Sequence, residues 1–256
     1  GVGDYLDFVM RDDRINVVML FLEVLREPDR FAAAALEAVR RNKRIIVTRV
    51  GRTEGGRAAV AAQRGALAGD DAVYDAFFRK YGIVRAADLD EMVETAALFA
   101  AYPNAPSNPH VVPVTLSGGE AGLIADLASE RGLSLPDLSP ETLARLRPHF
   151  APYFTPRNPL DAYGLGWSRE RFIDLLQTLL ADQTFGTIAH GVDASSGGLG
   201  DTLLTGEIAD IYAAIDIPAG KRVVFFTNTG GGGVNPEIRA VLKKKGIPFL
   251  CGMRPS

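Results

Sequence analysis

The sequence is poor in the residues that build disulfide frameworks, metal clusters and membrane spans. Its 256 residues include one cysteine, Cys251, and three histidines, which excludes an intrachain disulfide and any metal site made of several cysteines. A lone cysteine fits a reducing compartment. No apolar run approaches the roughly 20 residues that cross a bilayer, and no signal-peptide pattern is present. We therefore expect a cytoplasmic protein with no membrane partner and no metal site.

Neither sign of charge predominates in the sequence. The chain has 28 Lys and Arg residues against 31 Asp and Glu residues, a formal net charge of -3. Nucleic-acid binding requires a clustered basic face, so no nucleic-acid partner is expected. The one basic run, Lys243–Lys245, is predicted to lie at a helix C-terminus, where cations favour the helix dipole. Hydrophobic residues at 47% and charged residues at 23% indicate a globular protein.

Short apolar runs alternate with amphipathic helices in the first half, a rhythm typical of parallel α/β sheets. The three strands predicted in this half would form only a marginal sheet by themselves. We therefore expect the first domain, residues 1–103, to be incomplete at its N-terminus and the chain to be a fragment of a longer polypeptide. The predicted strands are 17–22, 44–50 and 82–85, and the predicted helices are 4–11, 29–41, 66–81 and 87–102.

A proline-rich stretch, residues 104–110, predicts a stiff linker, and the same rhythm restarts after it. Residues 111–256 should form a second domain, and both domains a tandem of flavodoxin-like, doubly wound parallel sheets that bind ligands at the carboxyl ends of their strands. Serines 139 and 168 are predicted helix N-caps. The predicted strands are 111–116, 186–192, 223–228 and 247–250, with a short apolar run at 133–138, and the helices are 117–131, one starting after Ser139, 167–180, 203–215 and 235–245.

Two glycine-rich turns follow predicted strands in the second domain. Ser117-Gly118-Gly119 begins a helix, whose N–H groups could contact a phosphate; the alternative is a tight turn that uses glycine only for its backbone. The loop Thr227–Gly233 contains four glycines, which are costly to order unless something approaches closely. A ligand or an adjoining domain could supply that reason, and a loop without function is the alternative.

Few other residues suggest chemistry. Glu23 follows a predicted strand, where it could orient an imidazole or bind a cation, or simply pair with Arg26. The three histidines, His110, His149 and His190, are isolated from one another, and a lone strand histidine is more often a core residue than a catalyst. No nucleophile-elbow or zinc-protease motif occurs, so hydrolase and metalloenzyme functions are not supported.

Several motifs, in order along nearly the whole chain, resemble those of the NDP-forming acyl-CoA synthetases, the relatives of succinyl-CoA synthetase. The first domain carries a Leu-Glu pair that ends a strand and a Gly-Arg loop, and the second carries a Gly-Gly turn. The matching segments are Asp4–Asp13, Leu22-Glu23, Val50–Glu54, Gly65–Gly69, Ala72–Ala76, Ser117–Gly119, Leu138–Thr142 and Asn158–Asp161.

The resemblance implies a site in which a histidine carries phosphate between two helix N-termini, one in each domain. Gln63 stands in the place of that histidine, with Arg64 and Gly65 after it. Glu23 would be the carboxylate that orients the imidazole. The expected phosphate or ligand contacts are Gly51, Arg52, Arg64, Gly65, Ser117, Gly118 and Gly119.

A carboxamide is not a nucleophile, because its nitrogen lone pair is delocalised into the carbonyl, so Gln63 cannot carry a phosphoryl group. Arg64 could instead hold an anion there. Two functions follow from the resemblance. One is part of an acid–thiol ligase that makes a CoA thioester through an acyl phosphate. The other is an inactive module that responds to CoA or nucleotide, such as one fused to a protein acetyltransferase.

The resemblance also implies cofactors and partners. CoA and ATP or ADP with Mg are expected, bound mainly by ATP-grasp and CoA-binding domains or subunits outside this chain. A small-molecule acid is the expected substrate, and an oligomer the expected assembly.

Overall fold

The computed structural model describes residues 1–64, 70–194 and 202–254, and the chain divides into two compact units. The first unit is Gly1–Asn104 and the second is Ala105–Arg254. The helix predicted at 66–81 begins partly outside the described residues, and the described helix there starts at Asp71.

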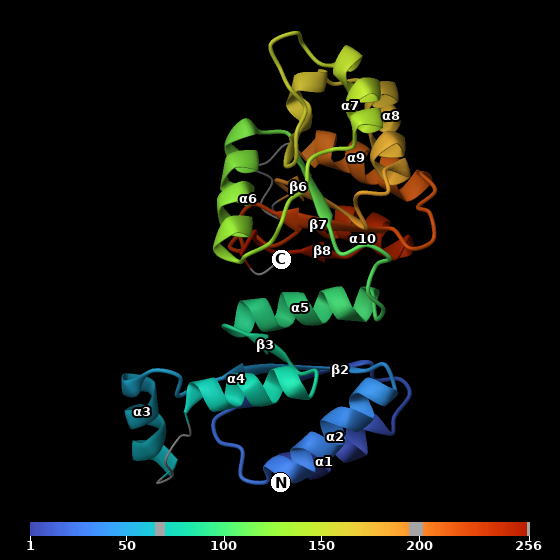
Figure 1. The fold of residues 1–256 in the computed structure, drawn as a ribbon. Helices are drawn as coiled ribbons and strands as arrows, with labels where there is room; N and C mark the ends of the chain where they lie inside the picture. The colour runs from blue at the N-terminus through green and yellow to red at the C-terminus, as the bar shows by residue number, and fades with distance from the viewer. Residues whose placement is uncertain (65–69, 195–201, 255–256) are drawn as a thin grey trace. The chain divides into compact units, whose positions relative to one another are not determined.

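The described part of the first unit contains a parallel sheet of three strands in the order β1-β2-β3. Helices α1, α2 and α4 cover one face of the sheet, and α5 covers the other (Figure 1). This division follows from alternation, because Ile45 and Val47 of β2 point to one face while Ile46 points to the other. The strands are β1 (Val17–Leu22), β2 (Arg44–Arg49) and β3 (Val84–Ala86), and the helices are α1 (Val2–Met10), α2 (Pro28–Arg40), α3 (Glu54–Arg64), α4 (Asp71–Lys80) and α5 (Leu89–Ala101).

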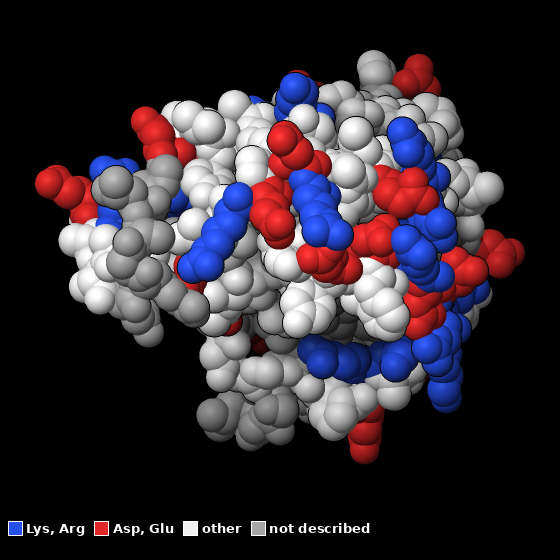
Figure 2. Space-filling model, turned by 90° about the horizontal axis from the view of Figure 1, so that it is seen from below, with Lys and Arg blue, Asp and Glu red and all other residues white. Residues whose placement is uncertain are grey.

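The outer surface of α1 and α2 is covered with ion pairs. Arg11 pairs with Asp7 at 2.7 Å, and Arg30 pairs with Asp4 at 2.5 Å. Figure 2 shows acidic and basic side chains side by side over much of the face that it presents. Exposed pairs of this kind add little stability.

The residues described in the second unit form five parallel strands in the order β5-β4-β6-β7-β8, which in chain order is 2-1-3-4-5, the flavodoxin arrangement. The predicted fold class, two flavodoxin-like α/β domains, is confirmed. The strands are β4 (Val111–Thr115), β5 (Leu160–Asp161), β6 (Thr187–Val192), β7 (Arg222–Thr227) and β8 (Phe249–Leu250). The helices are α6 (Gly118–Glu130), α7 (Pro140–Leu146), α8 (Arg169–Ala181), α9 (Thr202–Ala214) and α10 (Pro236–Lys244), with short 3₁₀ turns at Arg147–His149 and Ala162–Leu165.

The helix-end predictions in the second unit are confirmed. The Ser139 hydroxyl accepts a hydrogen bond from the Thr142 amide at 3.2 Å, and the Ser168 hydroxyl accepts one from the Arg171 amide at 3.5 Å. The basic run 243–245 ends α10. The apolar run 133–138 lies in neither a helix nor a strand. The edge strand β5 was not predicted. Two residues are too short to give a strand pattern.

His190 is buried in an aromatic cage at the centre of the second unit. Its Nδ1 lies 3.1 Å from the Tyr212 hydroxyl, and its ring packs against Phe172, Tyr212 and Phe225. Burial lowers the pKa of His190 to about 3, so the ring is neutral in the folded protein. This geometry identifies His190 as a core residue.

Among the described residues, none of the helices is both long and apolar enough to span a bilayer.

The neutral His190 predicts that the second unit loses stability in mild acid. The unfolded chain binds a proton near pH 6.5 and the folded chain only near pH 3, so the stabilisation is complete above pH 6.5 and declines as the pH falls below it. We expect a loss of about 1.6 kcal/mol between pH 6.5 and pH 5, with a slope that approaches about 1.4 kcal/mol per pH unit at the acid end. Urea titrations followed by fluorescence of Trp167, the only tryptophan, measure it.

His190→Gln should flatten this pH dependence, whereas the control His149→Gln, on an exposed histidine, should leave it as it is. An equal slope in His190→Gln and the unaltered chain would refute the assignment.

Candidate functional site

The carboxyl ends of β1, β2 and β3 meet at one edge of the first sheet, because the strands are parallel. Glu23 follows β1 there and is half-buried. Gly51 follows β2 with φ of 78°, in the left-handed region that favours glycine. The exposed Arg52 beside it donates a hydrogen bond to the Ala87 carbonyl at 3.2 Å, just after β3. The structure therefore brings Gly51 and Arg52 to the edge where Glu23 lies.

A buried ion cluster stands at the same edge. The Arg49 side chain, with 0% exposure, donates a hydrogen bond to Asp71 Oδ1 at 2.7 Å. Arg85 donates to both oxygens of Asp71 at 2.7 Å. The Arg49 guanidinium also lies 3.8 Å from the centre of the Tyr74 ring. These contacts hold the start of α4 against the ends of β2 and β3.

Asp71 is ionised in this cluster. Burial by itself would raise its pKa, but the Arg85 hydrogen bond and the charges of Arg85 and Arg49 outweigh that effect and lower it. Sequence reasoning missed the cluster. The available signal was Arg49, a charged residue that ends strand β2 after the apolar run Ile45–Val47. The other members of the cluster, Asp71 and Arg85, lie 22 and 36 positions further along the chain, so no local pattern indicates them.

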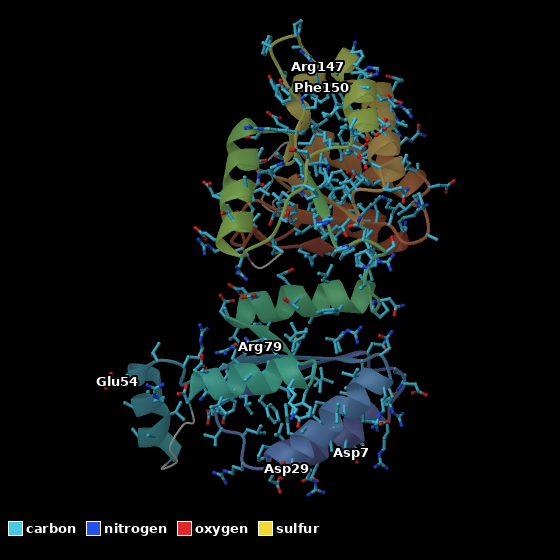
Figure 3. All side chains as sticks on the ribbon, in the orientation of Figure 1. Asp7, Asp29, Glu54, Arg79, Arg147 and Phe150 are labelled. Atoms are coloured by element: carbon cyan, nitrogen blue, oxygen red, sulfur yellow. The ribbon has the colours of Figure 1, made fainter. Side chains whose placement is uncertain are left out.

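Helix α3 follows this edge and was not predicted. The Thr53 hydroxyl accepts a hydrogen bond from the Gly56 amide at 3.1 Å, and Glu54 projects outward from the first turn (Figure 3). Gln63 and Arg64 close α3, but their side chains and all of Gly65 lie outside what the structure describes. Their place in the site stays a prediction.

The carboxyl edge of the second sheet is acidic. Ser117 is the N-cap of α6, and its hydroxyl accepts a hydrogen bond from the Glu120 amide at 3.4 Å. The Glu120 carboxylate accepts hydrogen bonds from the Thr115 hydroxyl and from the Asn228 amide, so it bridges the ends of β4 and β7. Asp161 Oδ2 lies so close to Gly118 that a Cβ there would be 3.2 Å from it.

Acidic side chains surround the N-terminus of α6. Burial raises the pKa of Glu120, and the negative charges of Asp193 and Asp161 raise it further. The edge lies at the switch point of the 2-1-3-4-5 sheet, where ligands bind in such folds. A phosphate at Gly118 and Gly119 would face these carboxylates, so the predicted phosphate contact there stays a prediction and meets an opposing field.

The four-glycine loop is held at its start. The Thr227 hydroxyl donates to the Thr229 carbonyl at 2.7 Å and accepts from the Gly252 amide at 2.9 Å. Within 4 Å of a Cβ built on Gly230 or Gly231 there is no other atom of the described chain. The Asn228 Oδ1 is buried and has no hydrogen-bond partner among the described residues, so it could accept a hydrogen bond from a ligand.

Comparisons with known proteins agree with the fold. Residues 1–99 match the family described as succinyl-CoA ligase-like flavodoxin domain. The chain is 35% identical over 163 residues to the α subunit of the ADP-forming acetate–CoA ligase I of Pyrococcus furiosus, covering 64% of this chain and 35% of that one. It is 28% identical over 247 residues to the ADP-forming acetate–CoA ligase I of Archaeoglobus fulgidus, covering 96% of this chain and 33% of the relative.

Another relative and a solved structure extend the match. A trans-feruloyl-CoA synthase from an unknown prokaryotic organism is 28% identical over 256 residues, with 98% of this chain and 35% of the relative covered. The dinucleotide-forming acetyl-coenzyme A synthetase 1 of Ca. Korarchaeum cryptofilum, in complex with phosphate and ADP, superposes with a TM-score of 0.76 at 22% identity, covering 100% of this chain and 54% of that one. The chain thus spans about a third of the length of these curated relatives.

Asp71→Asn should destabilise the first unit by about 3 kcal/mol, because it leaves the charge of Arg49 buried without its carboxylate partner. Circular dichroism during urea unfolding measures the loss, and the Trp167 signal from the second unit should stay unchanged. The control Asp75→Asn removes a more distant carboxylate, 3.4 Å from Arg85, and should cost less than about 1 kcal/mol. Equal losses of unfolding free energy in the two variants would contradict the claim that the buried cluster stabilises the first unit more than the exposed pair does.

Removing negative charge beside α6 should improve phosphate binding. The double variant Glu120→Gln with Asp161→Asn keeps hydrogen-bonding groups at both positions but lacks both charges. We expect inorganic phosphate to bind roughly tenfold more tightly or better, about 1.4 kcal/mol, which NMR shifts of the Gly118 and Gly119 amides would report. Glu130→Gln, at the other end of α6, is the control and should have no effect. Equal phosphate affinity in the double variant and the unaltered chain would contradict the electrostatic argument.

Proposed function

The chain is homologous to ADP-forming acetyl-CoA synthetases over most of its length, with a succinyl-CoA ligase-like flavodoxin domain at residues 1–99, and from this premise we propose that it forms part of an acid–thiol ligase. The proposed reaction joins a small carboxylic acid to CoA through an acyl phosphate, with ATP converted to ADP and phosphate. One relative is named as an α subunit, which supports a multi-part assembly with further domains or subunits.

The observation that carries the proposal is the homology itself, which runs through both units. The strand ends of the first unit add support, because the predicted residues Glu23, Gly51 and Arg52 gather at its carboxyl edge. The relatives' names differ in the acid, acetate in two and ferulate in a third, so the acid used here is not assigned.

CoA and ATP both carry phosphates, and the second unit's edge does not fit a phosphate. Among Ser117, Glu120, Asp161, Asp193 and Asn228, the members of that edge, three are carboxylic acids and none is basic. We therefore propose that ATP-grasp and CoA-binding modules outside residues 1–256 hold ATP, Mg and CoA. The first unit's edge carries the exposed Arg52 and suits an anion better.

A second candidate function rests on Gln63. If position 63 takes the place of the phosphate-carrying histidine, its carboxamide cannot accept a phosphoryl group, and the chain would be an inactive module that responds to CoA or nucleotide. The acidic α6 N-terminus favours the same alternative. A protein acetyltransferase fused to such a module is one setting for it.

Gln63→His should gain phosphoryl uptake when the chain is combined with the ATP-grasp and CoA-binding modules of a relative. The bond between the γ-phosphorus of ATP and its bridging oxygen would break, a phosphorus–nitrogen bond would form at the new imidazole, and ADP would leave. With radiolabelled ATP, the expected label on this variant is labile to acid and stable to base. Gln63→Asn is the control and should stay unlabelled.

The outcomes separate the two candidates. Label on the unaltered chain with the same stability would indicate a phosphohistidine elsewhere and would count against the inactive module. No label on Gln63→His in the active mixture would refute the placement of position 63 in the site.

A further inference from the structure

The side chain of Tyr74 connects α4 to the chain that leaves β1. Its hydroxyl accepts a hydrogen bond from the Leu25 amide at 3.1 Å, across 49 positions of the sequence. Leu25 belongs to residues 23–26, which lie in neither a helix nor a strand, and Glu23 is in the same stretch. Tyr74 and Leu25 are both half-buried and pack against the same apolar core. The hydrogen bond therefore joins α4 to the segment that carries Glu23.

Arg49 holds the ring of the same tyrosine. Its guanidinium lies 3.8 Å from the ring centre, and its side chain has 0% exposure. A cation on an aromatic face attracts the ring more strongly when both are shielded from water. The guanidinium is held in turn by Asp71 at 2.7 Å, and Asp71 lies three residues before Tyr74 on α4. The buried cluster thus fixes the ring while the hydroxyl is engaged by Leu25.

These contacts reach the carboxyl ends of all three strands of the first sheet. Arg85 lies in β3, Arg49 ends β2, and Leu25 follows β1. Each is bound by a residue of α4, because Asp71 accepts hydrogen bonds from both arginines and Tyr74 accepts the one from Leu25. Irregular segments beyond a strand end are ordinarily more mobile than the strands themselves. A hydrogen bond from a packed helix side chain restricts the segment after β1.

We propose that Tyr74 is a positioning residue for Glu23. By holding the Leu25 amide, its hydroxyl fixes the segment after β1, so that the Glu23 carboxylate keeps one orientation at the carboxyl edge before any ligand binds. Tyr74 acts only through Glu23 and contacts no reacting atom. This role rests on the proposed function, in which Glu23 orients the imidazole that carries phosphate.

NMR of the full 256-residue chain tests the positioning without any activity measurement. Tyr74→Phe keeps the ring against Arg49 but removes the hydroxyl oxygen that accepts from Leu25. We expect the Leu25 amide to exchange with solvent roughly fivefold to tenfold faster, the effect of losing about one hydrogen bond. Three-bond couplings should show one dominant χ1 rotamer of Glu23 in the unaltered chain and an average over rotamers in the variant.

Tyr81→Phe is the matched control. Tyr81 follows the last residue of α4, and its ring centre lies 4.7 Å from that of Phe77. The loss of its hydroxyl should change neither the Leu25 exchange nor the Glu23 couplings. Circular dichroism verifies that both variants fold. Unchanged Leu25 exchange or an unchanged Glu23 rotamer in Tyr74→Phe would overturn the proposal.

A rate measurement extends the test to the proposed reaction. In the Gln63→His chain combined with the modules of a relative, adding Tyr74→Phe should slow label uptake from radiolabelled ATP roughly tenfold. The KM for ATP and the final amount of label should stay unchanged, because other modules hold ATP and the folded fraction is the same. A purely structural role of Tyr74 would lower the final amount of label instead.

The two readouts separate this positioning from the proposed function. If Gln63→His takes up no label while Tyr74→Phe still releases the Glu23 rotamer, the proposed function fails and the positioning of Glu23 by Tyr74 stands. If Gln63→His takes up label at the same rate with and without Tyr74→Phe, the positioning fails and the ligase assignment stands.

Discussion

The parallel direction of the strands is the constraint on which the rest of this structure depends. Parallel strands place all their amino ends at one edge and all their carboxyl ends at the other. A buried lysine stabilises the amino edge of each sheet. Lys43 Nζ donates to the Met10 and Asp12 carbonyls at 2.8 and 2.7 Å, and Lys221 Nζ donates to the Asp182 and Phe185 carbonyls. The polar residues of the candidate site lie at the carboxyl edges.

The two carboxyl edges differ in charge. The first holds Arg49 and Arg85 around Asp71, with Asp75 also paired to Arg85, and the second holds Glu120 between Thr115 and Asn228 with two further aspartates nearby. The charges of the first edge are largely balanced, so it opposes an anion less than the second edge does. A carboxamide at position 63 could not carry a phosphoryl group covalently.

Most of the fold was predictable from the sequence because local signals repeat. Apolar runs such as Ile45–Thr48 gave the strands, and serines 117, 139 and 168 gave helix starts that the structure confirms. Helix α3 was missed because Gly55 and Gly56 weaken its helical pattern, although Thr53 caps it. The Arg49 cluster and the Glu120 bridge join residues far apart in the chain, Asn228 lying 108 positions from Glu120, and periodicity carries no such information.

We expect position 63 to lie at the carboxyl edge of the first sheet, beside Glu23. A nitroxide on Gln63→Cys, in a chain that also carries Cys251→Ser, tests this placement by broadening the NMR signals of nearby amides. The expected result is broadening of Glu23, Gly51 and Ala87, which stand at the carboxyl ends of β1, β2 and β3. Broadening confined to Asn16, Lys43 and Ile83, at the amino ends of the same strands, would contradict it.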